Sequence, residues 1–306
     1  MKFISSIALL VACGFITSEG FQLNPTHSAS KLLVASNKIQ EVATPSAIQG
    51  NRQASSALFA ATPQESPSNE LDTDALVKYG SSIGIQMGII TALLFGLDTL
   101  VGAIGLEVPF PIVFCLFYFF SLKSRTFNPL NNQRPNLKKA VNGEGTPTKG
   151  FRDRVMPSWT PPGVTFPIMW ILVIGPLRSF SSALVYMANG HHFCDPTLLA
   201  LLLHLSIGDV WNTINNTEKR YGAAVPSVLM VAAAAANAAF QYSQVDPFAG
   251  KLLGLTLVWF AVASTLIADT WRLNPNPSTG QRDPLYPVTG GEGKTEFAWF
   301  NSSLQE

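Results

Sequence analysis

Long apolar runs dominate the chain from residue 80 onward, with short polar segments between them. A helix needs about 20 apolar residues to cross a bilayer. Five runs approach or exceed that length, at residues 80–105, 164–187, 197–214, 222–241 and 250–271. A sixth run, residues 110–122, is shorter and follows Pro109, so it predicts a partial or interfacial helix or one arm of a hairpin. The pattern predicts an all-α integral membrane protein: a five-helix transmembrane bundle with an extra short helix near the N-terminus.

The charges between the runs support this division. The segment 121–157 carries eight basic residues against Glu144 and Asp153, whereas the loop 188–196 carries no Lys or Arg. Lys219 and Arg220 mark the next loop, the loop 242–249 again has no basic residue, and Arg272 follows the last run. Basic and non-basic loops therefore alternate through four consecutive spans, as the positive-inside rule requires.

The N-terminus has the pattern of a targeting sequence. Lys2 precedes an apolar core over residues 3–16, and small residues follow, which is typical of a signal peptide covering residues 1–20. Residues 21–64 are rich in Ala, Ser and Thr, carry several basic residues and contain one acid, as transit peptides do. Together the two segments, with Phe21 at their junction, resemble the bipartite plastid presequence of algae with secondary plastids.

This pattern divides the chain into five parts. The signal peptide (1–20) and plastid transit peptide (21–64) precede an acidic linker at 65–79, a helical membrane domain at 80–274 and an irregular tail at 275–306. The expected location is a plastid membrane, either envelope or thylakoid. The alternative is a plain secretory leader followed by a disordered arm, which would place the protein in the endoplasmic reticulum or another secretory membrane.

Composition excludes several classes of protein. The 306 residues are 47% hydrophobic and only 13% charged, whereas soluble domains carry about 25% charged residues. The net charge of +1 argues against nucleic acid as a partner, because phosphate binding needs a large basic excess. Cys13 lies in the expected leader, and Cys115 and Cys194 are too few for a disulfide framework.

The stretch PSWTPPGVTFPIMW, residues 157–170, opens the second long run. Proline is tolerated in the first turn of a helix, so Pro161 and Pro162 predict a helix start near Val164. Trp159 would then lie at the membrane boundary, where an amphipathic ring is favoured, and Trp170 about two turns inside the helix.

This stretch resembles the start of the second helix in the TspO/MBR family, the tryptophan-rich sensory or translocator proteins. The resemblance covers residues 157–274 without a gap from Val245 onward. It includes the following matching positions: Trp211, Lys219, Arg220, Gly222, Val245, Pro247, Ala249, Leu252, Leu253, Trp259, Thr265, Leu266, Trp271 and Arg272. It implies a five-helix bundle that binds a tetrapyrrole. Ile174, Arg178, Gly208 and Ile267 depart from the family pattern, and the Tyr of its sterol-associated motif is missing around Asp269, which counts against sterol binding.

The resemblance implies a ligand cavity lined by tryptophans. Trp159, Trp170, Trp211 and Trp259, with Pro161 and Pro162, would surround a flat macrocycle, which needs a large apolar wall and a few donors for its carboxylates. The alternative is that these residues serve helix packing and the membrane interface. A tetrapyrrole is the expected ligand, and no obligatory cofactor is expected.

Two charges fall inside expected spans. Arg178 and Asp209 each cost roughly 3 kcal/mol to place in a bilayer, so both should face the bundle interior with a partner. Arg178 could bind a ligand carboxylate with Asp209 orienting it, or the two could form a structural pair. His204, about one and a half turns before Asp209, could join the same polar patch or be a satisfied buried histidine. Asp98 has no evident partner.

Further patterns bear on metals and partners. The loop HHFCD, residues 191–195, holds metal-ligand residue types without a second cluster, so no metal site is expected. Gly84 and Gly88, and the small residues at 232–236, permit close helix approach, which could build a homodimer or serve packing within the bundle.

The leading hypothesis is a membrane protein that binds a tetrapyrrole, either porphyrin or chlorophyll derivative, and senses, sequesters or moves it within the plastid. One alternative is a transporter of another small hydrophobic or anionic metabolite, for which Arg178 is the relevant feature. The other is a structural or assembly subunit of a pigment–protein complex, although His204 is the only histidine in an expected span. No nucleotide loop, nucleophile elbow or zinc helix appears, so no enzymatic activity is expected.

Overall fold

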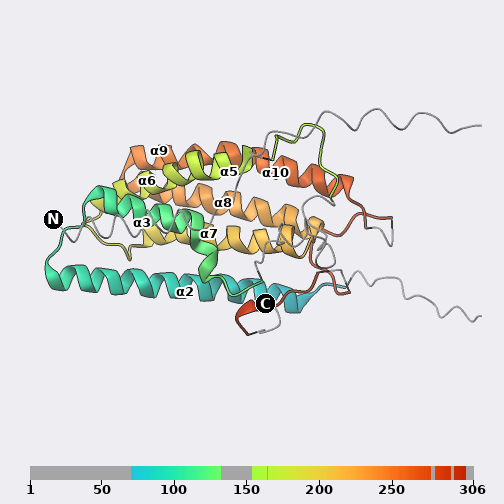
Figure 1. Ribbon diagram of the computed structural model, residues 1–306, viewed down its shortest axis with the longest axis horizontal. Coiled ribbons are helices and arrows are strands. Elements are labelled where there is room, and N and C mark those ends of the chain that lie inside the picture. The colour runs from blue at the N-terminus through green and yellow to red at the C-terminus, as the bar shows by residue number, and fades with distance from the viewer. Residues whose placement is uncertain (1–69, 132–153, 164, 277–279, 291–292, 301–306) are drawn as a thin grey trace, which may run out of the picture. The chain divides into compact units, whose positions relative to one another are not determined.

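The computed structural model describes residues 70–131, 154–163, 165–276, 280–290 and 293–300, all within the compact unit Glu65–Glu306. The expected signal and transit peptides lie outside the described residues. Figure 1 shows long helices running side by side through the described part.

Helices account for nearly all regular structure in the described ranges. In chain order these are α2 (Thr73–Ile104), α3 (Phe110–Lys123) with η1 (Ser124–Phe127), α5 (Thr165–Ile168), η3 (Met169–Ile174), α6 (Gly175–Ala188), α7 (Pro196–Asn212) with η4 (Thr213–Thr217), α8 (Tyr221–Val245), α9 (Pro247–Gly254), α10 (Thr256–Leu273) and η5 (Ala298–Phe300). Within the described part of the chain, six continuous helical stretches are long and apolar enough to span a membrane. The expected all-α membrane fold with one helix beyond five is therefore confirmed.

The first two helices differ in length from the expectation. α2 begins at Thr73, inside the expected acidic linker, because the Asp72 side chain accepts a hydrogen bond from the Ala75 amide at 2.9 Å and caps the helix. Gly105 ends α2 in the left-handed conformation, at φ 61°. The run 110–122 continues through η1 to Phe127, which makes it 18 residues long and a sixth candidate span rather than a partial one.

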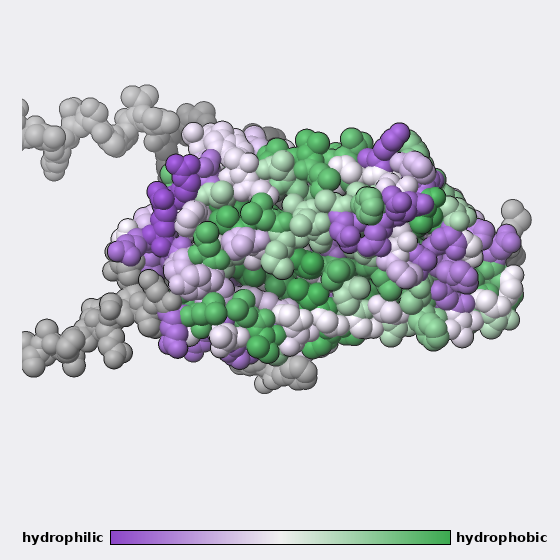
Figure 2. All heavy atoms as spheres, turned by 180° about the vertical axis from the view of Figure 1, so that it is seen from behind, coloured by the Kyte–Doolittle hydropathy of each residue, from purple (hydrophilic) through white to green (hydrophobic). Residues whose placement is uncertain are grey.

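The bundle packs as neighbouring pairs. α6 packs against α3 and α9, while α8 lies between α7, α9 and α10. α2 packs mainly against α7, and Figure 1 shows it along one side of the bundle. The largest core cluster joins α2, α3, α6, α7, α8 and α9 around side chains such as Phe117, Tyr186 and Tyr242. Figure 2 shows a mainly hydrophobic surface in the middle of one face, with hydrophilic residues toward both ends, as a bilayer requires.

Asp98 has two hydrogen-bond partners that the sequence did not reveal. Its two carboxylate oxygens accept hydrogen bonds from the backbone amides of Phe193 and Cys194, at 2.7 and 2.8 Å. Asp98 therefore anchors the loop that joins α6 to α7. Within the described residues no group of three or more potential ligands could hold a metal ion.

The small residues singled out for close helix approach differ in their surroundings. A Cβ built on Gly84 or Gly88 would meet no atom within 4 Å outside its own stretch of helix, so among the described residues these glycines serve no packing contact. Ala235 is buried in the bundle, whereas Ala233 and Ala236 are exposed. The homodimer stays a prediction.

Gln86 joins α2 to the bundle through polar contacts. Its Nε2 donates to Asp209 Oδ2 at 2.8 Å and to the Ser124 carbonyl at 3.1 Å, and its Oε1 accepts from Asn128 Nδ2 at 2.8 Å. Apolar packing alone gives little driving force for helix association in lipid, so these bonds matter for the position of α2.

We expect Gln86→Leu to lower the free energy of unfolding by about 2 kcal/mol, because it leaves buried polar partners unsatisfied. Thermal or denaturant unfolding in detergent measures this. Ile85→Ala is the matched control, since Ile85 is the neighbouring residue and faces outward. Equal losses in the two variants would contradict the prediction.

Candidate functional site

A buried cation lies at the centre of the candidate site. Arg178 of α6 is only 3% exposed, and its Nη2 lies 2.6 Å from Nε2 of His204 on α7. A guanidinium has donors only, so His204 Nε2 accepts this bond and Nδ1 carries the imidazole proton. Nδ1 then donates to the Val231 carbonyl of α8 at 3.0 Å. Three helices thus position Arg178 through one neutral histidine.

Aromatic rings surround the guanidinium. Its central carbon lies 5.1 Å from the centre of the Trp170 ring and 5.9 Å from that of Phe260. Phe260 of α10 also meets Trp170 and His204 edge-on, with ring centres 6.2 and 5.2 Å apart. Cation–π contacts of this kind strengthen when water is excluded.

The π-helix η3 sets the position of Trp170 relative to Arg178. The Gly175 amide bonds to the Trp170 carbonyl, which leaves the Ile171 carbonyl without its usual helical donor. The Tyr118 hydroxyl of α3 donates to that carbonyl at 2.8 Å. A Cβ on Gly175 would lie 2.8 Å from the Tyr118 ring, so glycine permits this close approach. Such π-bulges often occur at functional sites.

Arg178 has no carboxylate partner in the described part of the chain. Asp209, expected as its partner, instead accepts hydrogen bonds from Ser124 Oγ at 2.6 Å and from Gln86 at 2.8 Å. The expected direct pairing of Asp209 with Arg178 is therefore not found, because α2 and η1 supply donors that the sequence did not place there. His204, by contrast, does contact Arg178.

Two of the four expected tryptophans lie together. Trp170 and Trp211 both pack against the apolar cluster of Val231, Ala235 and Phe260. The indole nitrogen of Trp211 is buried without a hydrogen-bond partner among the described residues.

The other expected aromatic and proline residues lie elsewhere. Trp159 is 43% exposed and donates from Nε1 to Asp269 Oδ2 at 3.0 Å. Trp259 meets Phe166 edge-on at 5.9 Å. Pro161 and Pro162 lie in the segment before α5, as expected from a helix start.

An apolar groove of about 260 Å³ lies between the α5–α6 stretch and α10, and we call it the α6–α10 groove. It is lined by Met169, Val173, Ile174, Leu177, Leu255, Val258, Trp259 and Val262. Of these only Trp259 was expected from the sequence as a ligand-binding residue, while Ile174 was noted only as a departure from the family pattern. Apolar residues inside a span give no signal that distinguishes a groove from lipid contact or core.

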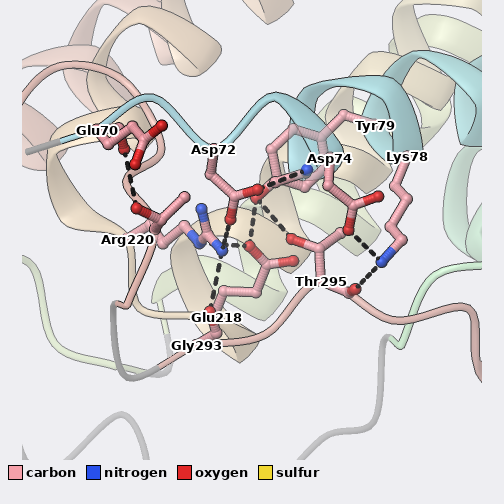
Figure 3. A network of polar contacts seen from close by, with 11 residues as sticks. Glu70, Asp72, Asp74, Lys78, Tyr79, Glu218, Arg220, Gly293 and Thr295 are labelled. Carbon is pink, nitrogen blue, oxygen red and sulfur yellow. Dashed lines mark hydrogen bonds and ion pairs between the residues drawn. The ribbon is translucent and has the colours of Figure 1, made fainter. Parts of the chain in front are cut away.

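A polar cluster at one end of the bundle joins α2 to the C-terminal tail, and we call it the Arg220 cluster (Figure 3). Arg220 Nη2 pairs with Asp72 Oδ2 at 2.8 Å and donates to the Gly293 carbonyl at 3.0 Å. Its Nε lies 3.2 Å from Glu218 Oε2, which also accepts a hydrogen bond from the Tyr79 hydroxyl.

The electrostatics of this cluster follow from burial. Burial raises the pKa of the Glu218 carboxyl, and the hydrogen bond from Tyr79 and the charge of Arg220 offset part of that rise. The sequence marked Arg220 as a boundary charge. It did not reveal Glu218 or the tail as its partners.

Comparison with known proteins supports the resemblance found in the sequence. Residues 137–272 match the TspO/MBR family. The human translocator protein is 32% identical over 152 residues, which cover 47% of this chain and 85% of the human protein. The pig translocator protein is 28% identical over 129 residues, covering 41% of this chain and 75% of the pig protein. α2 and α3 precede the matched residues.

We expect Arg220→Ala to release the tail, because Arg220 bonds to both Asp72 and Gly293. Limited trypsin digestion should then cleave after Lys294 at least about tenfold faster, as local opening exposes that peptide. Arg272→Ala is the control, since its exposed ion pair with Asp269, at 3.3 Å, contributes little. Unchanged cleavage in Arg220→Ala would show that other contacts hold the tail.

Proposed function

The chain belongs to the TspO/MBR family, and from this premise we propose that it is a membrane protein that binds a tetrapyrrole and senses, sequesters or moves it. The observation that carries the proposal is the Arg178 guanidinium, buried among aromatic rings with no carboxylate within ion-pair distance in the described part of the chain. A ligand carboxylate would supply the missing negative charge.

The physical fit is to a flat anionic ligand. A charge buried in a span costs roughly 3 kcal/mol, and an ion pair with a ligand carboxylate would offset that cost. Trp170, Trp211 and Phe260 belong to one apolar cluster near Arg178, and a macrocycle needs an apolar aromatic wall of this kind. The ligand is exchangeable in this proposal and the protein performs no chemistry on it. His204 positions Arg178 rather than acting as a base.

A second candidate function is the transport of another small apolar anion. The same arginine supports it, because an ionisable residue inside a span commonly marks a substrate path. The two candidates differ in ligand, so a protein that transports an anion through Arg178 without binding porphyrin would favour the second.

We place the protein in a plastid membrane, on the basis of the expected bipartite presequence over residues 1–64. The exposed glycine positions Gly84 and Gly88 on α2 would suit a homodimer in that membrane. Both statements rest on sequence features and remain proposals.

We expect Arg178→Met to weaken protoporphyrin binding by roughly 30- to 150-fold, which corresponds to the loss of about 2–3 kcal/mol from charge-assisted hydrogen bonds. Quenching of tryptophan fluorescence in detergent or liposomes measures the affinity. Arg178→Lys should retain more affinity than Arg178→Met, because it keeps the charge but loses the planar donor set.

Arg272→Met is the control for this experiment, since it removes an exposed arginine remote from the aromatic cluster. Thermal unfolding of each variant separates loss of binding from loss of fold. Wild-type affinity in a folded Arg178→Met protein would overturn the assignment of the carboxylate site to Arg178.

A further inference from the structure

The α6–α10 groove lies on the outside of the bundle, at the depth of the spans. Its walls carry only apolar side chains, and several face outward: Val258 is 69% exposed and Val173 is 36% exposed. Its floor is closed by Ile174, which is 1% exposed. The groove therefore opens toward lipid hydrocarbon and ends against a buried side chain.

Ile174, the buried residue at the floor of the groove, belongs to the same helical stretch as Trp170 and Arg178. Ile174 lies four residues after Trp170 and four residues before Arg178, which is about one helical turn from each. On the opposite wall, Trp259 lines the groove while its neighbour Phe260 contacts Trp170 and Arg178. A shift of Ile174 and Phe260 would connect the groove to the guanidinium.

The seam between these two helices is held mainly by aromatic edges. α10 packs against α8, and α6 packs against α3 and α9. Across the seam, Phe166 meets Trp259 and Trp170 meets Phe260, at 5.9 and 6.2 Å. Each aromatic pair contributes only about 0.5–1.5 kcal/mol beyond its area, and moving Phe260 also gives up its contact with the Arg178 guanidinium.

The backbone is irregular on both sides of the groove. η3 interrupts the regular helix over Met169–Ile174 on one wall, and Leu255 separates α9 from α10 on the other. Interruptions of this kind are where helices bend and adjust.

The aqueous end of the same seam is closed by hydrogen bonds. The Val155 amide donates to Asn274 Oδ1 and the Asn274 side-chain nitrogen donates to the Val155 carbonyl, both at 2.8 Å. Trp159 adds its bond to Asp269 one turn earlier on α10. A ligand that enters from water must therefore break these hydrogen bonds. A ligand that enters from lipid must separate the aromatic pairs of the seam instead.

We propose that the α6–α10 groove is a lateral entrance through which an apolar carboxylate passes between the bilayer and Arg178. This inference rests on the proposed function and adds the path and the ligand class: a molecule apolar enough to dissolve in lipid hydrocarbon, with an acidic group that ends at the guanidinium. The groove offers no polar partner to any ligand, so it does not distinguish acids from neutral lipids. The positive charge of Arg178 makes that distinction, because it attracts a carboxylate.

The test fills the groove without touching Arg178. Val173→Phe, Val258→Phe and the double variant place extra bulk on its two walls, and Leu229→Phe adds the same bulk on the exposed face of α8, where Leu229 is 54% exposed. Stopped-flow tryptophan quenching measures protoporphyrin IX association and dissociation with protein in liposomes of phosphatidylcholine.

The double variant should slow association and dissociation together, by about tenfold, and leave the dissociation constant within about threefold of wild type. An entrance affects both directions equally, because it changes the barrier and not the bound state. Leu229→Phe should bind and release the ligand at wild-type rates. Phe166→Ala, which removes a ring from the seam, should speed both steps.

Two results would overturn the entrance. One is wild-type rates in the double variant. The other is faster dissociation with weaker affinity, because that pattern belongs to a groove that holds the bound ligand rather than passing it. A wild-type protein that fails to bind protoporphyrin IX would overturn the proposed function as well, and the two failures are therefore distinguishable.

Discussion

The placement of a permanent positive charge inside the bundle governs the centre of this molecule. Arg178 cannot lose its proton to escape the cost of burial, so the surroundings must stabilise the charge. The structure does so with one neutral imidazole and two aromatic faces instead of a carboxylate. His204 must keep its proton on Nδ1 to serve as the acceptor, and the Val231 carbonyl enforces that tautomer. Three helices are oriented by this single chain of contacts.

Asp209 is a buried carboxylate, and hydrogen-bond donors from other helices stabilise its negative charge. Its carboxylate takes donors from Gln86 and Ser124, which belong to the two helices that precede the residues matched to the TspO/MBR family. Those helices are thereby joined through polar bonds to the part of the bundle that matches the family, and such bonds are more specific in lipid than apolar contact is. Asp209 therefore makes no direct ion pair with Arg178, and the two opposite charges attract each other only through space.

Some of this architecture could be predicted from the sequence and some could not. Hydropathy and loop charge located the spans, and Pro161 and Pro162 marked the start of the second matched helix, because these signals act within one segment. Trp170 and Trp211, which pack against the same apolar cluster, were singled out together only by the family resemblance. The partner of Asp209 could not be predicted, since it depends on how α2 and α7 are rotated toward each other. The π-helix η3 likewise rotates Trp170 relative to Arg178 within the α5–α6 stretch, and it leaves no mark in the apolar pattern.

In the proposed function, the α6–α10 groove would give a ligand access from the bilayer, and Arg178 would select which ligand binds. An apolar groove admits any lipid-soluble molecule, and therefore carries no information about charge. Arg178 responds to charge and is buried beside Phe260, and the bonds of Val155 to Asn274 and of Trp159 to Asp269 join the segment before α5 to the end of α10. Under the proposed function, a ligand would have to satisfy two conditions in sequence, solubility in hydrocarbon and possession of an acidic group. The aromatic rings next to Arg178 would then favour a flat ring system among such acids.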